Sequence, residues 1–126
     1  MVEVKFYDSI DDKFLKFAVI ISKTNGKWIF CKHKERDTYE VPGGHRESGE
    51  DILATAKREL MEETGATDFT IKPICAYSVK GQTNVIENIR DETFGMLFFA
   101  EVFSFQEIHS EIEKILITDN LVENWT

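Results

Sequence analysis

The pattern of hydrophobic and polar positions divides the chain into several strand-like segments around one helix-like segment. Residues 16–22 form a nearly continuous apolar run, typical of a strand buried on both faces. Asn25-Gly26 then favours a tight hairpin turn, because both residue types tolerate positive φ, and residues 28–32 are the expected partner strand. Residues 69–79 and 94–105 predict two further strands, and residues 112–117 a short final one. The polar stretch 80–93 is long for a simple connection, which is typical of a lid or binding loop.

One amphipathic helix is expected between Ser48 and Gly65. Ser48 is the expected N-cap, with Asp51 three residues later in a near capping box, and Gly65 matches a glycine that ends a helix. Apolar residues recur at spacings of three and four, which gives the helix one apolar face. These residues are Ile52, Leu53, Ala56 and Leu60. Strands around one helix, with another element starting at Asp119 or Asn120, predict an α/β layered domain with a mixed sheet.

Length and composition indicate a single packed domain over residues 1–126. The sequence is 42% apolar and contains no internal repeat, low-complexity tract or linker. No apolar stretch approaches the roughly 18 residues needed to cross a bilayer, and the N-terminus has no signal-like apolar region. Cys31 and Cys75 lie in apolar runs, so we expect buried free thiols and a cytoplasmic protein.

Charge is unevenly distributed along the chain. The 23 acidic and 15 basic residues give a net charge of −8, whereas a protein that binds DNA or RNA over a broad face carries the opposite excess. Extended nucleic-acid binding is therefore excluded. Residues 44–66 hold 6 acidic and 3 basic side chains, and residues 101–126 hold 6 and 1, so the excess acid lies in two segments.

Three glutamates of the expected helix are candidates for metal binding. Glu59, Glu62 and Glu63 occupy positions i, i+3 and i+4, which places them within one turn on one face. Like charges at this spacing weaken an isolated helix by roughly 0.2–0.5 kcal/mol per pair, so helix propensity does not explain them. One interpretation is a solvated acidic face with Arg58 paired to Glu62. The other is a site for a hard divalent cation, which prefers oxygen ligands.

The spacing around these glutamates favours the second interpretation. Gly44 is followed after five residues by Glu50, and after seven more by the segment 58–66, RELMEETGA. This resembles the Nudix box, Gly-x5-Glu-x7-Arg-Glu-U-x-Glu-Glu-x-Gly-U with U a bulky apolar residue, and every fixed position is filled. At about 5–7% for each residue type, seven fixed identities coincide by chance with a probability on the order of 10⁻⁸. Ala66 is smaller than the usual final aliphatic residue, which affects local packing rather than chemistry.

The resemblance implies a Nudix-type α/β/α sandwich with a central mixed β-sheet. It also implies hydrolysis of a nucleoside diphosphate linked to another moiety, by water attacking phosphorus in line with the leaving phosphate oxygen. By position, the metal ligands are Glu59, Glu62, Glu63 and the carbonyl of Gly43. Because a polyphosphate adds further negative charge, about two or three Mg²⁺ or Mn²⁺ ions are expected with substrate.

The remaining fixed positions of the box are structural in this resemblance. They are Gly44, Glu50, Arg58 and Gly65, with Glu50 and Arg58 as a pair that links the loop to the helix. The carboxylate that removes the proton from water is left open by the sequence. Glu59 is one candidate, and Glu111 and Glu113, on one face of the short final strand, are the others.

Basic residues before the box are candidate ligands of the substrate phosphates. Lys32, Lys34 and Arg36 alternate just ahead of the Pro-Gly-Gly turn, and His45 and Arg46 follow it. A solvated charged loop is the alternative interpretation. Family members keep basic residues here for the phosphates that do not react, so charge-assisted phosphate contacts are implied by the resemblance.

Markers that identify the substrate in other branches of the family are absent from this sequence. The remainder is most similar to the small antimutator-like enzymes that convert nucleoside triphosphates, including oxidised ones, to monophosphate and pyrophosphate. Tyr77 and Asn124 are the candidates for the base pocket. The alternatives are removal of pyrophosphate from RNA 5′ ends and a catalytically silent nucleotide sensor. The family's second helix is expected near the end of this sequence, so either this helix is vestigial or it involves residues beyond 126.

Overall fold

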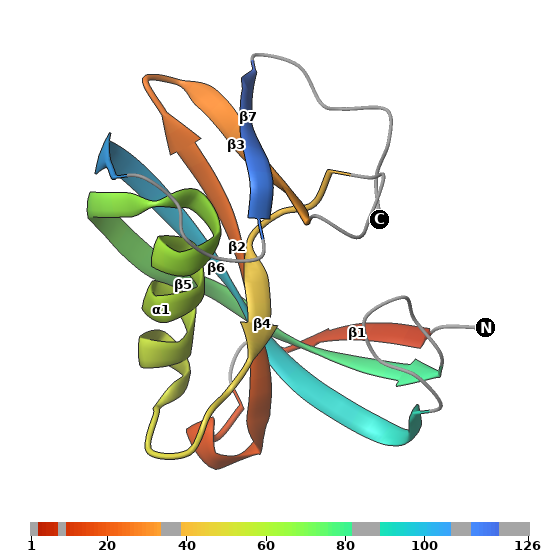
Figure 1. The fold of residues 1–126 in the computed structure, drawn as a ribbon. Coiled ribbons are helices and arrows are strands. Elements are labelled where there is room, and N and C mark those ends of the chain that lie inside the picture. Colours follow the sequence, from red (N-terminus) through yellow and green to blue (C-terminus); the bar gives the residue numbers. More distant parts are fainter. Residues whose placement is uncertain (1–2, 8–9, 34–38, 82–88, 107–111, 119–126) are drawn as a thin grey trace.

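The structure, a computed structural model, describes residues 3–7, 10–33, 39–81, 89–106 and 112–118 (Figure 1). Within these ranges one α-helix packs against strands that are far apart in the sequence. The elements are β1 (Glu3–Tyr7), η1 (Asp12–Phe14), β2 (Leu15–Thr24), β3 (Lys27–His33), β4 (Gly43–His45), α1 (Ile52–Thr64), β5 (Ala66–Gly81), β6 (Ile89–Phe105) and β7 (Ile112–Thr118).

The strands form one mixed sheet in the order β1-β5-β6-β2-β3-β7, with the short strand β4 paired to β2. β2 and β6 run parallel, whereas the other described pairs run antiparallel. The α/β class with a central mixed sheet is therefore confirmed. The second helix of the expected sandwich falls after residue 118, outside the described residues.

The hairpin between β2 and β3 forms where the sequence predicts it. Asn25 and Gly26 have φ of 50° and 77°, as a turn with two left-handed positions requires. Lys23 and Trp28 pair across the hairpin, and the Lys23 Nζ lies 4.1 Å from the centroid of the Trp28 ring.

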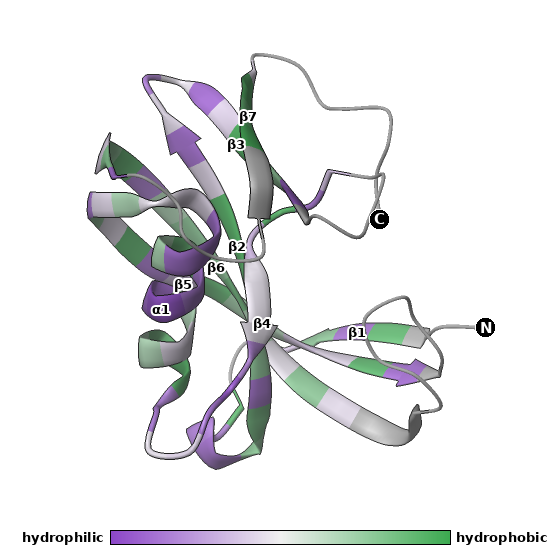
Figure 2. Cartoon of the chain, viewed as in Figure 1, coloured by the Kyte–Doolittle hydropathy of each residue, from purple (hydrophilic) through white to green (hydrophobic). Residues whose placement is uncertain are grey.

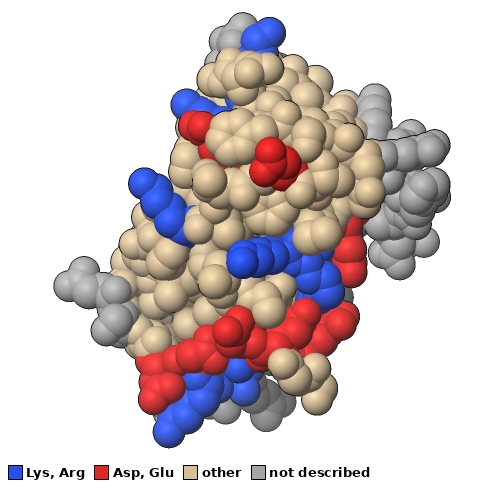
Figure 3. All heavy atoms as spheres, turned by 90° about the vertical axis from the view of Figure 1, so that its left-hand side faces the viewer, with Lys and Arg blue, Asp and Glu red and all other residues tan. Residues whose placement is uncertain are grey.

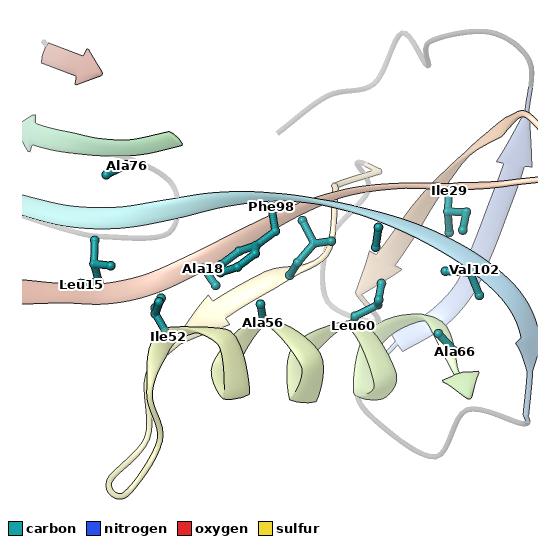
Figure 4. Close-up of a cluster of buried hydrophobic side chains, with 12 residues drawn as sticks. Leu15, Ala18, Ile29, Ile52, Ala56, Leu60, Ala66, Ala76, Phe98 and Val102 are labelled. Carbon is teal, nitrogen blue, oxygen red and sulfur yellow. The ribbon is translucent and has the colours of Figure 1, made fainter. Parts of the chain in front are cut away.

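α1 covers one face of the sheet with its apolar side (Figure 4). Ile52, Ala56 and Leu60 are buried and point toward Leu15 of β2 and Phe98 of β6. Hydrophilic residues lie along much of α1 in Figure 2, while hydrophobic residues recur along the strands that it covers. Each large apolar side chain buried here contributes about 1.5–3 kcal/mol of transfer free energy, which fixes the helix on the sheet.

The helix begins three residues later than predicted. Asp51, not Ser48, is the N-cap, and its Oδ1 accepts a hydrogen bond from the Ala54 N–H at 2.8 Å. Gly49, with φ of 85°, turns the chain between the two candidates and leaves Ser48 exposed, and Asp12 accepts the N–H of Ile52, the first residue of the helix. The other end agrees with the prediction, because Gly65 has φ of 78° and its N–H donates to the Met61 carbonyl at 3.0 Å.

Two further predictions are corrected by the sheet. β5 and β6 extend into the polar stretch 80–93, as far as Gly81 and from Ile89 onward, and the two extensions pair with each other through Gly81 and Ile89. Cross-strand hydrogen bonding therefore overrides the polar composition. Cys31 is buried as expected, but Cys75 is only half-buried. Among the described residues we find no helix with the length and hydrophobicity of a membrane span.

Candidate active site

β4 brings Gly43 and the first two residues of the box, Gly44 and His45, against α1. The Gly43 N–H donates to Glu63 Oε1 at 2.7 Å, and the carbonyl of His45 accepts from Arg58 Nη2 at 2.9 Å. Between them, a Cβ placed on Gly44 would lie 2.5 Å from the Glu59 carboxyl carbon. The strand and the helix therefore face each other with no room for a side chain at Gly44.

Pairing with β2 on its other side explains why β4 also needs a glycine at its first position. Gly43 pairs with Val19, and a Cβ on Gly43 would lie 2.6 Å from the carbonyl oxygen of Ala18. A backbone oxygen within the sheet cannot move aside as a flexible side chain can. The Gly-Gly sequence thus lets β4 fit between the sheet and the helix, which predicts different costs for alanine at the two positions.

Arg58 is the central cation of the site. Its Nε donates to Glu50 Oε2 at 2.6 Å and its Nη2 to Glu50 Oε1 at 3.1 Å, a bidentate geometry. Its Nη1 donates to Glu59 Oε1 at 2.6 Å and to Glu62 Oε2 at 3.5 Å, and it lies 3.6 Å from Glu47 Oε2. One guanidinium therefore faces four carboxylates. The Glu62 contact, which the solvated-face interpretation required, is weaker than those with Glu50 and Glu59.

The electrostatic environment differs strongly between the two ends of this cluster. Hydrogen bonds from Arg58 lower the pKa of the Glu50 carboxyl to about 2. Burial raises the pKa of Glu59, against the opposing hydrogen bond from Arg58. Burial also raises the pKa of Glu63 to about 8, and the neighbouring carboxylates of Glu59, Glu40 and Glu62 add to the effect despite the hydrogen bond from Gly43. Around Glu59 and Glu63 the carboxylates therefore outnumber the cations that could balance their charge.

The donor chemistry of this cluster fits a hard divalent cation. The glutamate side chains of the cluster end in carboxylate oxygens, the ligands that Mg²⁺ prefers. In the described part of the chain, however, no three Asp, Glu, His or Cys side chains are arranged as a ready-made metal site. Glu59 is turned toward Arg58 and Glu63 toward the Gly43 N–H. Metal binding would therefore exchange these hydrogen bonds for coordination.

Acidic side chains also dominate the surface near the helix. Figure 3 views the molecule from the side that carries α1 in Figure 1 and shows a band of Asp and Glu across its lower part, with Lys and Arg beside it. Glu62 is exposed, whereas Glu63 is buried. The acidic cluster is therefore open to the solvent through Glu62 and closed toward the sheet at Glu63.

Arg46 makes contacts within the protein, whereas its position after the turn suggested a contact with phosphate. Its Nη2 donates to Asp12 Oδ2 at 2.8 Å, its Nη1 to the carbonyl of Asp12 at 2.6 Å, and its Nε to the carbonyl of Glu50 at 2.7 Å. All three guanidinium nitrogens are engaged within the protein. Asp12, which sequence reasoning missed, also accepts the Ile52 N–H at 3.0 Å. The one local signal was the Asp-Asp pair at 11–12, typical of a helix start.

The candidate phosphate ligands and the alternative base are only partly described. Lys32 lies near the end of β3 and is half-buried. Its neighbour Cys31 pairs with Glu40, so the end of β3 lies beside the segment that leads into β4. Lys34, Arg36, Glu111 and Asn124 lie outside the described residues. Glu113 lies in β7, and only its backbone is described.

Tyr77 belongs to a cross-strand row on the sheet that reaches β4. Tyr77 pairs with Gly95, Gly95 with Phe17, and Phe17 with His45. The Phe17 ring lies edge-on to Tyr77, with centroids 5.5 Å apart, and to His45, with centroids 6.2 Å apart. Burial raises the pKa of the Tyr77 hydroxyl far above its usual value. Tyr77 is therefore a neutral aromatic residue, connected through Phe17 to the strand that carries the box glycines.

Comparison with known proteins identifies relatives of this chain. The family model of the NUDIX domain matches residues 13–117. The chain is 36% identical over 85 residues to a Bacillus subtilis (strain 168) protein named "Putative 8-oxo-dGTP diphosphatase YtkD", covering 68% of this chain and 53% of that protein. It is 35% identical over 102 residues to the ADP-ribose pyrophosphatase of the same organism, covering 77% of this chain and 51% of that protein. The chain thus spans about half the length of the curated relatives it matches.

Solved structures resemble this fold over most of the chain. The crystal structure of the Bacillus subtilis pyrophosphohydrolase BsRppH matches with a TM-score of 0.78 and 26% identity, over 98% of this chain and 74% of that one. A NUDIX hydrolase from Nitrosomonas europaea matches with a TM-score of 0.64 and 20% identity, over 82% and 72% of the two chains. The second likeness is one of fold alone.

Proposed function

The chain belongs to the NUDIX family, and from this premise we propose that it hydrolyses a phosphoanhydride bond in a nucleoside polyphosphate. The observation that supports the proposal most is the contact of β4 with α1. Gly43 holds Glu63, Gly44 makes room for Glu59, and Arg58 reaches from Glu50 to Glu59.

NUDIX proteins generally use divalent metal ions, and the acidic end of the cluster suits that requirement. We assign Glu59, Glu62, Glu63 and the carbonyl of Gly43 as the groups that would hold Mg²⁺ or Mn²⁺, about two or three ions with substrate. When bound, the metal supplies Lewis acidity toward the phosphoryl oxygen and the attacking water. Before a metal binds, Arg58 holds the Glu59 carboxylate in place through their 2.6 Å contact.

The chain's own residues then divide the remaining tasks. Lys32, Lys34 and Arg36 bind the phosphate oxygens that do not react. Glu59 or Glu113 accepts the proton from the attacking water as its oxygen bonds to phosphorus. The P–O bond to the leaving phosphate breaks as the new bond forms, and the leaving oxygen takes the electron pair. For a nucleoside triphosphate the products are the nucleoside monophosphate and pyrophosphate.

A nucleoside triphosphate, with a normal or oxidised base, is the substrate class that we propose. The relative named for 8-oxo-dGTP supports this choice, because it shares 36% identity over the region that contains the box. We place the base near Tyr77 and Asn124, where a neutral aromatic side chain and an amide offer stacking and hydrogen bonding. A triphosphorylated RNA 5′ end carries the same polyphosphate and is the second candidate.

A substrate panel tests the proposal. Phosphate and pyrophosphate release would be measured with Mg²⁺ for the common and oxidised nucleoside triphosphates, ADP-ribose and a triphosphorylated oligonucleotide. We expect Glu62→Gln and Glu63→Gln to lower kcat by about 10²-fold or more, because each removes a ligand charge. The matched control is Glu101→Gln, an exposed glutamate of β6.

Three results would contradict parts of the proposal. No release from any substrate by the wild-type protein would favour a silent nucleotide sensor. Unchanged kcat in both glutamine variants would remove the metal assignment. Preference for the oligonucleotide over every free nucleotide would replace the proposed substrate class with RNA 5′ ends.

A further inference from the structure

We propose that Asp12, in η1, acts as a positioning residue for the glutamates of α1. The inference rests on the proposed function. Its basis is a set of hydrogen bonds that joins η1 to both ends of the loop between β4 and α1.

Asp12 holds this loop at two points. Its Oδ1 accepts the Ile52 N–H at 3.0 Å, where α1 begins. Its Oδ2 and its carbonyl oxygen accept Arg46 Nη2 and Nη1 at 2.8 and 2.6 Å, just after β4 ends. Arg46 also donates from Nη1 to the carbonyl of Leu15 at 3.2 Å, so the arginine is tied to the first residue of β2.

The same network continues to the glutamates. Arg46 Nε donates to the carbonyl of Glu50 at 2.7 Å. The carboxylate of Glu50 accepts the Thr55 hydroxyl at 3.0 Å and pairs with Arg58 at 2.6 Å. Arg58 in turn donates to Glu59 Oε1 at 2.6 Å. A continuous path of short hydrogen bonds therefore leads from η1 to a candidate metal ligand.

Other contacts join the loop to itself or, through Glu50 and Arg58, to α1. Ser48 and Gly49 are exposed, and Gly49 has φ of 85°. The loop's internal bonds join the Glu47 N–H to Glu50 Oε1 at 2.9 Å and the Glu50 N–H to the Glu47 carbonyl at 3.2 Å. These bonds shape the turn but do not attach it to the sheet. Asp12 and Arg46 make that attachment, together with the Arg46 N–H bond to the Lys16 carbonyl at 2.7 Å.

Loosening the attachment should therefore affect chemistry more than substrate binding. Glu50 would shift with the loop, and Arg58 and Glu59 would follow it. Misplacement of reacting groups by about 1 Å can cost on the order of 10²-fold in rate. The proposed substrate contacts of Lys32 and Tyr77 lie on β3 and β5, so KM should change little.

The test compares Asp12→Ala and Asp12→Asn with Asp68→Asn, an exposed acid of β5, at a temperature at which each protein is folded by circular dichroism. For Asp12→Ala we expect kcat at least tenfold lower with KM within threefold of wild type. We also expect amide hydrogen exchange at Ile52 and in residues 46–51 to become at least tenfold faster. Asp12→Asn keeps a side-chain oxygen for the Ile52 N–H, so its effects should be intermediate. Asp68→Asn should match the wild type in both measurements.

Two results would overturn the inference. One is a folded Asp12→Ala protein, or Asp12→Asn where the alanine variant does not fold, with kcat within twofold of wild type. The other is a loss of kcat without faster exchange in the loop, because the effect would then not pass through the attachment. A wild-type protein without activity would instead overturn the proposed function, and exchange at Ile52 would still report whether Asp12 holds the loop.

Discussion

The two arginines of the box, Arg46 and Arg58, have opposite surroundings. Arg46 faces one carboxylate, that of Asp12, and otherwise donates to backbone carbonyls, so its charge is balanced. Arg58 faces four carboxylates and one carbonyl, so its surroundings keep an excess of negative charge. The first region is electrostatically complete within the protein, and the second is not.

This difference distinguishes a region that stabilises the structure from a region that can bind a ligand. Charges that are balanced and hydrogen-bonded, such as those around Arg46, keep a segment in place. They leave no excess charge that would attract a ligand. Clustered carboxylates that share one cation are costly in a folded protein unless another positive charge joins them. We therefore expect divalent cations to stabilise the Arg58 region and to have little effect on the Arg46 region.

Removal of the central cation should give the largest effect. Arg58→Met leaves Glu50 and Glu59 without their charge-assisted partner, so we expect the free energy of unfolding to fall by about 2–3 kcal/mol. Urea denaturation would measure this. Lys57→Met, at the exposed neighbouring position, is the control, and its unfolding free energy should stay within about 0.5 kcal/mol of wild type.

Divalent cations test the same contrast between the Arg46 and Arg58 regions. If the excess charge near Arg58 is the binding site, saturating Mg²⁺ should restore more stability to Arg58→Met than it adds to the wild type, because more carboxylate is left unbalanced. An Arg58→Met protein as stable as Lys57→Met, with or without Mg²⁺, would show that the carboxylates do not depend on this cation.

The two glycines of β4 should respond differently to alanine, with a smaller effect than loss of Arg58. In Gly43→Ala the new Cβ meets the backbone oxygen of Ala18, so we expect a loss of about 2 kcal/mol in the free energy of unfolding. In Gly44→Ala it meets the carboxylate of Glu59, the flexible end of a side chain, so stability should fall by less than about 1 kcal/mol.

The two alanine variants should rank in the opposite order for loss of activity as for loss of stability. Gly44→Ala displaces Glu59, so we expect kcat to fall by about tenfold or more although the protein remains stable. Each variant is the control for the other, with denaturation and steady-state kinetics measured on both. Equal stability losses in the two variants, or a Gly44→Ala protein with wild-type kcat, would contradict this account of β4.

The features predicted correctly from the sequence are those set by nearby residues. Asn25-Gly26 forms the hairpin because its backbone preference is local, and Gly65 ends the helix for the same reason. The box spacing places Glu50 eight residues before Arg58, and the structure brings the two within hydrogen-bonding distance. In each case a few consecutive residues carry the necessary information.

The features that sequence reasoning missed depend on residues far apart in the chain. Ser48 and Asp51 are both good N-caps, and the choice depends partly on Asp12, which binds the Ile52 N–H from 40 residues away. The extension of β5 and β6 into a polar stretch depends on their pairing with each other, as between Gly81 and Ile89. The function of Arg46 likewise depends on η1. The spacing of residues within one segment of the sequence does not indicate these distant partners.

The smallest of the expected effects concerns the pH dependence of stability. Arg58 lowers the pKa of Glu50 to about 2 in the folded protein, whereas an unfolded chain has a Glu pKa of about 4.3. The unfolded state therefore takes up a proton first as the pH falls. The stabilisation from Glu50 is complete above about pH 5 and is lost progressively as the pH falls toward 2.

Glu50→Gln isolates this contribution from that of the other acids. The difference in unfolding free energy between wild type and Glu50→Gln should be largest near neutral pH and shrink between about pH 5 and 2. In the Arg58→Met background the same substitution should show a much weaker pH dependence, because the cation that lowers the pKa is gone. A difference that is constant over this range in the wild-type background would mean that Glu50 and Arg58 do not form the pair in solution, and the electrostatic contrast between the two arginines would then rest on Glu47, Glu59 and Glu62.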